Sequence, residues 1–190
     1  MALPRIVASA GQKRFAIFGY ANATSEQFMP NIIVNMKLDS IDIRILEILQ
    51  QDAELQVAEV AQRVGLSTTP CWRRIQRLKE SGVITRQVAL LDAQKVNVGV
   101  TVFVAVRTST HSQQWFETFK ATVQAIPEVV EFYRMSGDVD YLLRVVVPDI
   151  AAYDRVYKRL IAGTELRDVS SSFAMEELKL TTALPLGYVG

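Results

Sequence analysis

The sequence has little of the two residue types that build disulfides and zinc sites. Its 190 residues include one cysteine, Cys71, and one histidine, His111. A lone cysteine excludes a disulfide within the chain, and one Cys with one His excludes a conventional zinc cluster. No apolar run approaches the length of about 20 residues that a membrane-spanning helix needs. These absences favour a protein of the reducing cytoplasm that does not cross a membrane.

Signatures of catalysis are also missing from the sequence. The chain has no nucleophile–base arrangement, no glycine-rich loop that would cradle a phosphate, and no cluster of metal ligands. His111 stands just before a predicted helix and is expected to be a polar residue of its capping region. We therefore expect no enzymatic activity, no metal and no cofactor. An enzyme that acts on amino acids is the alternative.

The composition supports folded cores without a general attraction to nucleic acid. The chain is 49% hydrophobic and carries a net charge of +1. Its length allows one large or two small domains. Positive charge is concentrated locally, at Arg73, Arg74 and Arg77. Such a cluster favours a targeted contact over bulk electrostatic adhesion.

Residues 1–36 differ from the rest of the chain. They show no clear periodicity, and Met36 stands directly before the first ordered pattern. We interpret them as a disordered leader, or as a segment upstream of a translation start at Met36. A secretory signal is the weaker alternative, because the apolar stretch at residues 15–21 is very short.

Residues 55–81 predict two helices joined by a tight turn. The first helix has apolar residues at helical spacing: Val57, Val60, Ala61 and Val64. Gly65 follows directly, where a chain leaving a helix often needs a positive φ. Ser67, Thr68 and Thr69 offer N-caps for the second helix, and Pro70 suits its first position. This pattern is typical of a helix-turn-helix.

The second of these helices is expected to have an apolar side and a basic side. Trp72, Ile75 and Leu78 share the apolar side. Arginine can pair with both major-groove acceptors of guanine, and hydroxyl groups bind phosphates. We therefore expect this helix to bind double-stranded DNA through five residues: Thr68, Thr69, Arg73, Arg74 and Arg77. A solvated basic face with no DNA contact is the alternative.

Another helix and a small wing complete this predicted domain. Residues 40–51 carry an apolar stripe, with Asp39 and Ser40 as candidate caps. Residues 83–84 and 87–91 predict two short strands after Gly82. Residues 37–91 thus predict a winged helix-turn-helix domain, and residues 92–97 a linker.

Residues 98–190 predict an α+β domain. Strands are expected at 98–106, 129–135, 141–147 and 169–180, and helices at 112–126 and 150–161. The order β-α-β-β-α-β is that of a ferredoxin-like fold. Because both helices would cover one face of the sheet, the other face needs cover, which a two-fold dimer would supply. Such a dimer would also place two reading helices on a palindromic site.

Several strings of residues 37–185 resemble the Lrp/AsnC family of feast/famine regulators. They include Leu38-Asp39, Val64-Gly65-Leu66-Ser67, Thr69-Pro70-Cys71, Gly82-Val83-Ile84, Ala89-Leu90-Leu91-Asp92 and Ser136-Gly137-Asp138. Further strings, such as Ser171-Ser172-Phe173-Ala174-Met175-Glu176, are most similar to the branch of cysteine-responsive activators of cysteine detoxification. Regulators of branched-chain keto-acid or methionine breakdown share parts of these strings. Gln76 departs from the many relatives that carry a second arginine there, which leaves the base preference open.

The resemblance implies where the sites lie. It carries DNA contacts over to Thr69, Arg74 and Arg77, and it implies a C-terminal domain of the RAM type. Its effector pocket, at the contact between dimers, maps to a hairpin turn: Ser136, Gly137, Asp138, Asp140 and Tyr141. Asp138 or Asp140 would accept from the ammonium group of an amino acid, and backbone N–H groups beside Gly137 would bind its carboxylate. A turn that binds nothing is the alternative.

These inferences combine into one functional prediction. The chain is expected to be a cytoplasmic transcriptional activator whose dimers assemble into tetramers or octamers, as the family does. L-cysteine or another small amino acid bound between dimers would shift the assembly and thereby DNA binding. A protein that compacts DNA without any effector is the alternative.

Overall fold

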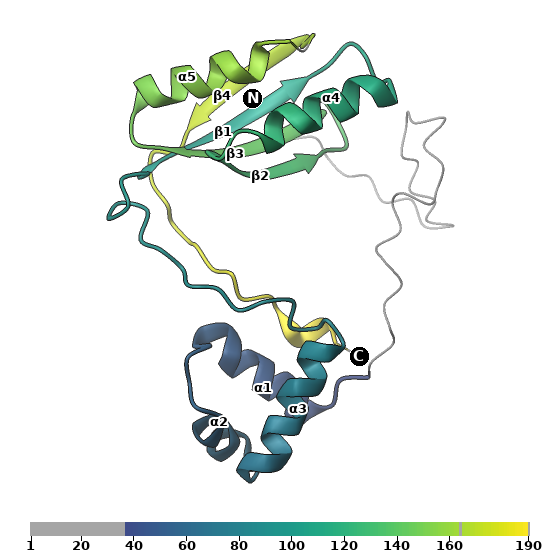
Figure 1. Ribbon diagram of the computed structural model, residues 1–190, viewed down its shortest axis with the longest axis vertical. Helices are drawn as coiled ribbons and strands as arrows, with labels where there is room; N and C mark the ends of the chain where they lie inside the picture. Colours follow the sequence, from purple (N-terminus) through teal and green to yellow (C-terminus); the bar gives the residue numbers. More distant parts are fainter. Residues whose placement is uncertain (1–36, 164, 190) are drawn as a thin grey trace, which may run out of the picture. The chain divides into compact units, whose positions relative to one another are not determined.

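The computed structural model describes residues 37–163 and 165–189 (Figure 1). The predicted leader, residues 1–36, lies outside the described residues. The described chain forms two compact units, one of residues 37–85 with 185–189, the other of residues 86–184. The sequence-based division assigned residues 185–189 to the C-terminal domain, and here the structure differs. Within residues 37–163 and 165–189, no helix has the length and apolar character needed to span a bilayer.

The first unit contains three helices: α1 (Ser40–Gln51), α2 (Val57–Val64) and α3 (Thr68–Glu80). Asp39 caps α1, since its carboxylate accepts the N–H groups of Ile41 and Asp42 at 2.9 and 2.8 Å. The Asp42 carboxylate accepts the Asp39 N–H at 3.2 Å in return, which completes a capping box. α2 ends at Gly65, whose φ of +75° confirms the predicted glycine cap.

α3 differs from the prediction at its start and on its apolar side. The helix begins after Ser67, so Pro70 is its third residue and not its first. Proline is tolerated there because the first N–H groups of a helix have no partner within it. The buried residues of α3 are Cys71, Ile75 and Leu78. Trp72 is 50% exposed and belongs to the outer side of the helix, although the periodicity placed it on the inner side.

The core of this unit includes the end of the chain as well as the helices. Its buried members come from all three helices: Ile45, Leu46, Val60, Ala61, Val64, Cys71, Ile75 and Leu78. Leu186 lies in the short 3-10 helix η1 (Leu186–Tyr188) and packs against them as a partly buried side chain. The last turn of the chain therefore contributes to the stability of the helical unit.

Leu186→Ala is expected to lower the free energy of unfolding of this unit by about 1–2 kcal/mol. The effect is smaller than the roughly 2–5 kcal/mol of a fully buried leucine, because part of the Leu186 side chain is in solvent. Urea denaturation followed by Trp72 fluorescence in a Trp115→Phe background measures it, since the chain has two tryptophans. Tyr188, which is 91% exposed, offers the matched control Tyr188→Ala. Equal effects of the two changes would contradict the packing role of Leu186.

The two strands predicted for a wing are absent from residues 82–99 of the described chain. The segment turns at Gly82, which has a φ of +75°, and forms no strand before β1. Val88, Leu90 and Leu91 are 60%, 71% and 73% exposed. A two-stranded ribbon is marginal in water unless one face is covered. These exposed side chains show that nothing in the described residues covers this segment, so a ribbon here would lack that support.

The second unit is a four-stranded antiparallel sheet with two helices on one face (Figure 1). Its elements are β1 (Val100–Arg107), α4 (Gln113–Gln124), β2 (Val129–Arg134), β3 (Tyr141–Val147), α5 (Ile150–Ile161) and β4 (Asp168–Phe173). The strand order β2-β3-β1-β4 confirms the ferredoxin-like α+β fold. α5 has the predicted bounds because Asp149 caps it, accepting the Ala152 N–H at 2.7 Å.

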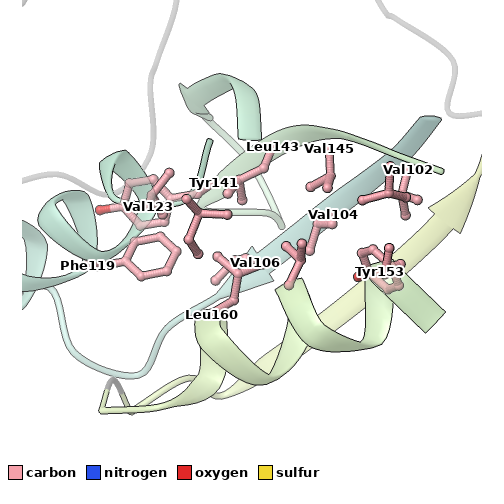
Figure 2. Close-up of a cluster of buried hydrophobic side chains, with 14 residues drawn as sticks. Val102, Val104, Val106, Phe119, Val123, Tyr141, Leu143, Val145, Tyr153 and Leu160 are labelled. Atoms are coloured by element: carbon pink, nitrogen blue, oxygen red, sulfur yellow. The ribbon is translucent and has the colours of Figure 1, made fainter. Parts of the chain in front are cut away.

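The core of the second unit lies between the sheet and its helices (Figure 2). Alternate residues of the two central strands point inward: Val102, Val104, Val106, Leu143, Val145 and Val147. Phe119 and Val123 of α4 and Leu160 of α5 pack onto them. Because strand side chains alternate, Phe103 and Leu142 lie on the opposite face, which neither helix covers.

β4 is shorter than predicted. The strand expected over residues 169–180 ends at Phe173, which pairs with Val102 of β1. In this register Val100, the first residue of β1, stands opposite Met175, so the chain beyond Met175 has no strand beside it to pair with. Met175 and Leu178, which follow, are 95% and 86% exposed. The sequence-based prediction therefore overestimated the length of this strand.

Candidate DNA interface and effector site

The N-terminal half of α3 presents polar side chains to solvent. Thr68, Thr69 and Arg73 are all exposed, and Trp72 lies beside them. Thr68 stands one helical turn before Trp72, so the hydroxyl and the indole share one side of the helix. A helix-turn-helix inserts this part of its second helix into the major groove. The structure thus leaves these three predicted DNA-binding side chains accessible and, within the described residues, without an ion pair to another helix.

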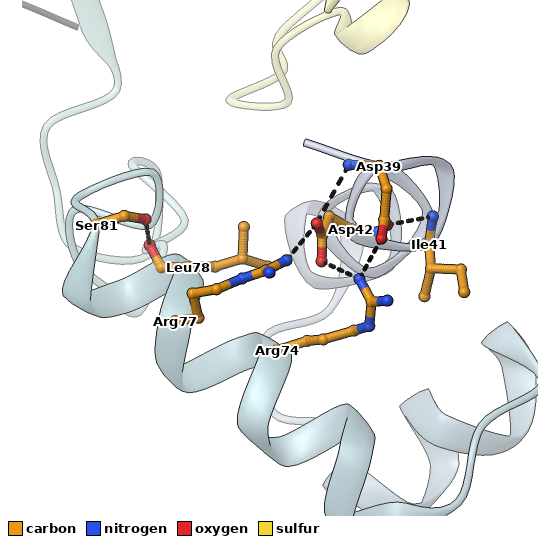
Figure 3. A network of polar contacts seen from close by, with 7 residues as sticks. All are labelled: Asp39, Ile41, Asp42, Arg74, Arg77, Leu78 and Ser81. Atoms are coloured by element: carbon orange, nitrogen blue, oxygen red, sulfur yellow. Dashed lines mark hydrogen bonds and ion pairs between the residues drawn. The ribbon is translucent and has the colours of Figure 1, made fainter. Parts of the chain in front are cut away.

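The other two, Arg74 and Arg77, bind carboxylates of α1 and its cap (Figure 3). Arg74 Nη1 donates to Asp39 Oδ2 at 2.6 Å and to Asp42 Oδ1 at 2.8 Å. Arg77 Nη2 donates to Asp42 Oδ2 at 2.6 Å. The side chain of Asp42 is 0% exposed, while those of Arg74 and Arg77 are 26% and 50% exposed. Both arginines therefore combine partial exposure with a structural ion pair.

The pairing favours the charged forms of Asp39 and Arg74. The Asp42 N–H holds the pKa of Asp39 below its ordinary value of 3.8, and the guanidinium of Arg74 acts in the same direction. Hydrogen bonds to Asp39 and to Asp42 raise the pKa of Arg74. Asp42 is a candidate functional residue that could not be predicted from the sequence. Asp42 lies three residues after Asp39, which is the spacing of a capping box, but no local sequence pattern indicates that it contacts α3.

The second predicted site lies in the turn between β2 and β3. Gly137 has a φ of +118°, a conformation that favours glycine. The Met135 N–H donates to the Asp140 carbonyl at 2.8 Å and closes the turn. Arg107 of β1 braces it, since its Nε donates to the Asp138 carbonyl at 2.7 Å. Sequence reasoning missed Arg107 because it lies on a different strand, about 30 residues earlier.

The two carboxylates of this turn have different surroundings. Asp140 is half-buried, and its Oδ2 accepts the Thr108 N–H at 2.8 Å. Asp138 is exposed, and its carboxylate has no hydrogen bond or ion pair within residues 37–163 and 165–189. Ser136 is exposed beside it. The Asp140 carboxylate therefore stabilises the fold, whereas the Asp138 carboxylate is accessible to a cation.

Tyr141, the last residue predicted for this site, has its ring in the core. It is 4% exposed, and its ring centroid lies 5.5 Å from that of Phe119 and 5.6 Å from that of Phe132. The ring supports the turn from below and does not line its outer surface. The turn itself is open.

A hollow of about 280 Å³ in this unit lies elsewhere, between the start of α4 and Gly163. The described residues contain no group of His, Cys, Asp or Glu side chains that could hold a metal ion.

Two family models match the chain. A winged helix-turn-helix DNA-binding model matches residues 38–85, which include α1, α2 and α3. An Lrp/AsnC ligand binding domain model matches residues 101–184, which include most of the sheet and both of its helices.

Relatives align with most of this chain and nearly all of their own length. The glutamate uptake regulatory protein of Zymomonas mobilis is 52% identical over 150 residues, which are 79% of this chain and 92% of that protein. The DNA-binding transcriptional activator DecR of Escherichia coli is 48% identical over 150 residues, 78% of this chain and 99% of that protein.

Solved structures show the same architecture. An AsnC family transcriptional regulator from Agrobacterium tumefaciens has a TM-score of 0.77 at 66% identity, covering 80% of this chain and 99% of that one. A transcriptional regulator from Neisseria meningitidis, solved with L-Met, has a TM-score of 0.76 at 36% identity, covering 79% and 97%. With its DNA-binding and ligand-binding domains, this chain is not an enzyme but a DNA-binding transcriptional regulator that belongs to the Lrp/AsnC family.

Proposed function

We propose that this regulator binds a specific DNA site through α3 and that a small amino acid controls the binding. The observation that carries the DNA site is the accessible N-terminal face of α3. The proposed contacts are Thr68, Thr69, Arg73, Arg74 and Arg77. Hydroxyls at the start of the helix suit phosphate oxygens, which set the register, and Arg73 suits the edge of a guanine. The regulator would act in the cytoplasm, as an activator.

The proposed effector site is the turn formed by Ser136, Gly137, Asp138, Asp140 and Tyr141. The observation that supports it is the exposed carboxylate of Asp138, which has no partner in the described residues, beside a glycine with positive φ. Asp138 would bind the ammonium group of an amino acid. Backbone N–H groups near Gly137 would bind its carboxylate, because no side chain covers the backbone there.

We propose L-cysteine as the first candidate for the effector, and cysteine detoxification as the process that the regulator controls. DecR, a transcriptional activator at 48% identity, is compatible with an activating role. The 52% identical regulator from Zymomonas mobilis is named for glutamate uptake, and the Neisseria meningitidis structure holds L-Met. L-glutamate and L-methionine are therefore the first competitors to test. Regulation of branched-chain amino-acid breakdown is the alternative pathway.

Self-association is proposed to use the uncovered face of the sheet. This face carries Phe103, which is 40% exposed, between the half-buried side chains of Leu142 and Val146. A pair of such faces would bury apolar area that a single chain leaves in water. A two-fold dimer would also double the number of α3 helices available to a palindromic site. Tetramers or octamers would enclose the effector turn, which is open in one chain.

Arg73→Ala is expected to weaken binding to the specific site by roughly tenfold or more, because a bidentate arginine–guanine contact contributes about 1–3 kcal/mol. Discrimination at one base pair should fall with it. Fluorescence anisotropy on the specific site and on single-base variants measures both quantities. Lys79→Ala removes the same charge from the last turn of α3 and serves as the control. Wild-type affinity in Arg73→Ala would refute the assignment of this residue.

A further inference from the structure

The carboxylate of Asp42 is fully buried at the junction of α1 and α3. A buried, unpaired carboxylate is strongly unfavourable, so such groups are found paired and hydrogen-bonded. Asp42 has three donors: Arg74 at 2.8 Å, Arg77 at 2.6 Å and the Asp39 N–H at 3.2 Å (Figure 3). The cap of α1 and two turns of α3 thus meet at one charged side chain.

The two arginines use their guanidinium groups differently. Nη1 of Arg74 bonds both Asp39 and Asp42, and its side chain is 26% exposed. Arg77 bonds Asp42 through Nη2, and half of its side chain remains in solvent. A guanidinium has five N–H donors. Arg77 therefore keeps donors in solvent for a further acceptor, whereas Arg74 binds two carboxylates and has less of its side chain in solvent.

We propose that Asp42 is a positioning residue for DNA binding. It fixes α3 on α1 through Arg74 and orients the guanidinium of Arg77 so that its remaining N–H groups meet a DNA phosphate. This inference rests on the proposed DNA-binding role of α3. It changes the role of Arg74 from a contact with DNA to a contact with α1.

A reading helix discriminates base pairs only when its side chains reach the base edges in one register. The apolar contacts of Cys71, Ile75 and Leu78 are not directional, since dispersion and the hydrophobic effect depend on area. Charge-assisted hydrogen bonds to a buried carboxylate are directional and fix both rotation and translation of the helix.

The charge of Asp42 allows a clear test, because two explanations predict opposite changes in DNA affinity when it is removed. If electrostatics alone mattered, Asp42→Asn would remove a negative charge near DNA and tighten binding. Positioning predicts instead that Asp42→Asn weakens binding to the specific site by roughly tenfold. Glu47→Gln is the matched control, since it removes an exposed carboxylate from the same helix and should leave affinity equal or slightly higher.

The measurement is fluorescence anisotropy of the full chain on the specific DNA site at several salt concentrations. Circular dichroism at the same temperature shows that each variant is folded. Arg77→Ala should reduce the steepness of log K, the DNA association constant, against log salt by about the contribution of one phosphate contact. Arg74→Ala should weaken binding and leave this slope unchanged. If Asp42→Asn does not fold, Arg74→Lys replaces it. That change keeps the charge, but the lysine ammonium on its flexible stem does not reproduce the fixed position of Arg74 Nη1 between the two carboxylates, so it should also weaken binding.

The outcomes separate the inference from the function on which it rests. Folded Asp42→Asn or Arg74→Lys that binds as tightly as wild type would overturn the positioning role. An unchanged salt slope in Arg77→Ala would overturn its phosphate contact. Wild-type protein with no preference for any candidate site over random DNA would refute the proposed function, and the inference with it.

Discussion

Phe119→Ala is expected to lower the free energy of unfolding of the sheet unit by about 3–5 kcal/mol, the range found for truncating a buried phenylalanine. Phe119 is 0% exposed and among the largest fully buried side chains. Its ring stacks on Trp115 at 5.1 Å and meets Phe132 edge-on at 5.7 Å. Trp115 and Phe132 also make ring contacts with Tyr141, so we expect them to move little into the cavity and the loss to be large.

Urea denaturation followed by Trp115 fluorescence in a Trp72→Phe background reports this unit alone. Phe119→Leu provides a graded control, because it keeps most of the apolar volume and should lose only about 1–2 kcal/mol. Trp72 fluorescence in the Trp115→Phe background should show little change for the helical unit. An unfolding midpoint of Phe119→Ala equal to that of the parent would contradict the packing described for this core.

Asp138→Asn is expected to abolish the response of DNA binding to an amino acid while leaving DNA affinity unchanged. Asparagine keeps the size of the side chain and removes the charge that would pair with the ammonium group. Losing one partner of an enclosed charge pair weakens binding by about 2–5 kcal/mol, or roughly 30-fold and more in affinity. Isothermal titration with L-cysteine, L-glutamate and L-methionine measures the binding. Anisotropy measures the response.

Two control variants make the assignment specific to Asp138. Asp154→Asn changes an exposed carboxylate of α5 and should keep the response. Asp140→Asn removes the acceptor of the Thr108 N–H, so it should lower the stability of the sheet unit as well as disturb the turn. An effector response in Asp138→Asn equal to wild type would place the ligand elsewhere.

Elements with strong local signals could be predicted from the sequence with their bounds. α1 and α5 begin where Asp39 and Asp149 cap them, and both coincide with the predicted ranges. β3 coincides as well, because it is a central strand with an alternating burial pattern and a turn before it. In each of these cases caps, turn residues and periodicity agree.

Elements that depend on distant contacts could not be predicted in the same way. Trp72 fits the periodicity of the inner face, yet Cys71, which fits it equally well, is the buried residue, because packing against α1 and α2 selects between them. The two strands predicted after Gly82 and the end of β4 were wrong, because strand-favouring residues do not show whether another strand lies beside them. Leu186 packs on helices more than 100 residues earlier in the chain, which no local pattern shows.

The candidate sites show the same difference between features set by local sequence and features set by distant contacts. The turn at Gly137 was visible because glycine and aspartate are turn residues, and the structure confirms the turn. The different roles of Asp138 and Asp140 depend on Thr108 and Arg107, which lie on or just after another strand. Arg74 and Arg77 pair with Asp42 across 32 and 35 residues of sequence. Helical geometry within α3 does not show such ion pairs, so both arginines were predicted to be available for DNA contacts.

The most direct test of the account is fluorescence anisotropy of wild-type protein on the DNA upstream of its own gene, at fixed salt because affinity depends on it. The protein is titrated without ligand and then with L-cysteine, L-glutamate or L-methionine. The account predicts tighter binding than to random DNA and a shift of the midpoint with one of these amino acids, L-cysteine first, that Asp138→Asn eliminates. Tight binding that no amino acid shifts would contradict it and indicate a protein that organises DNA without an effector.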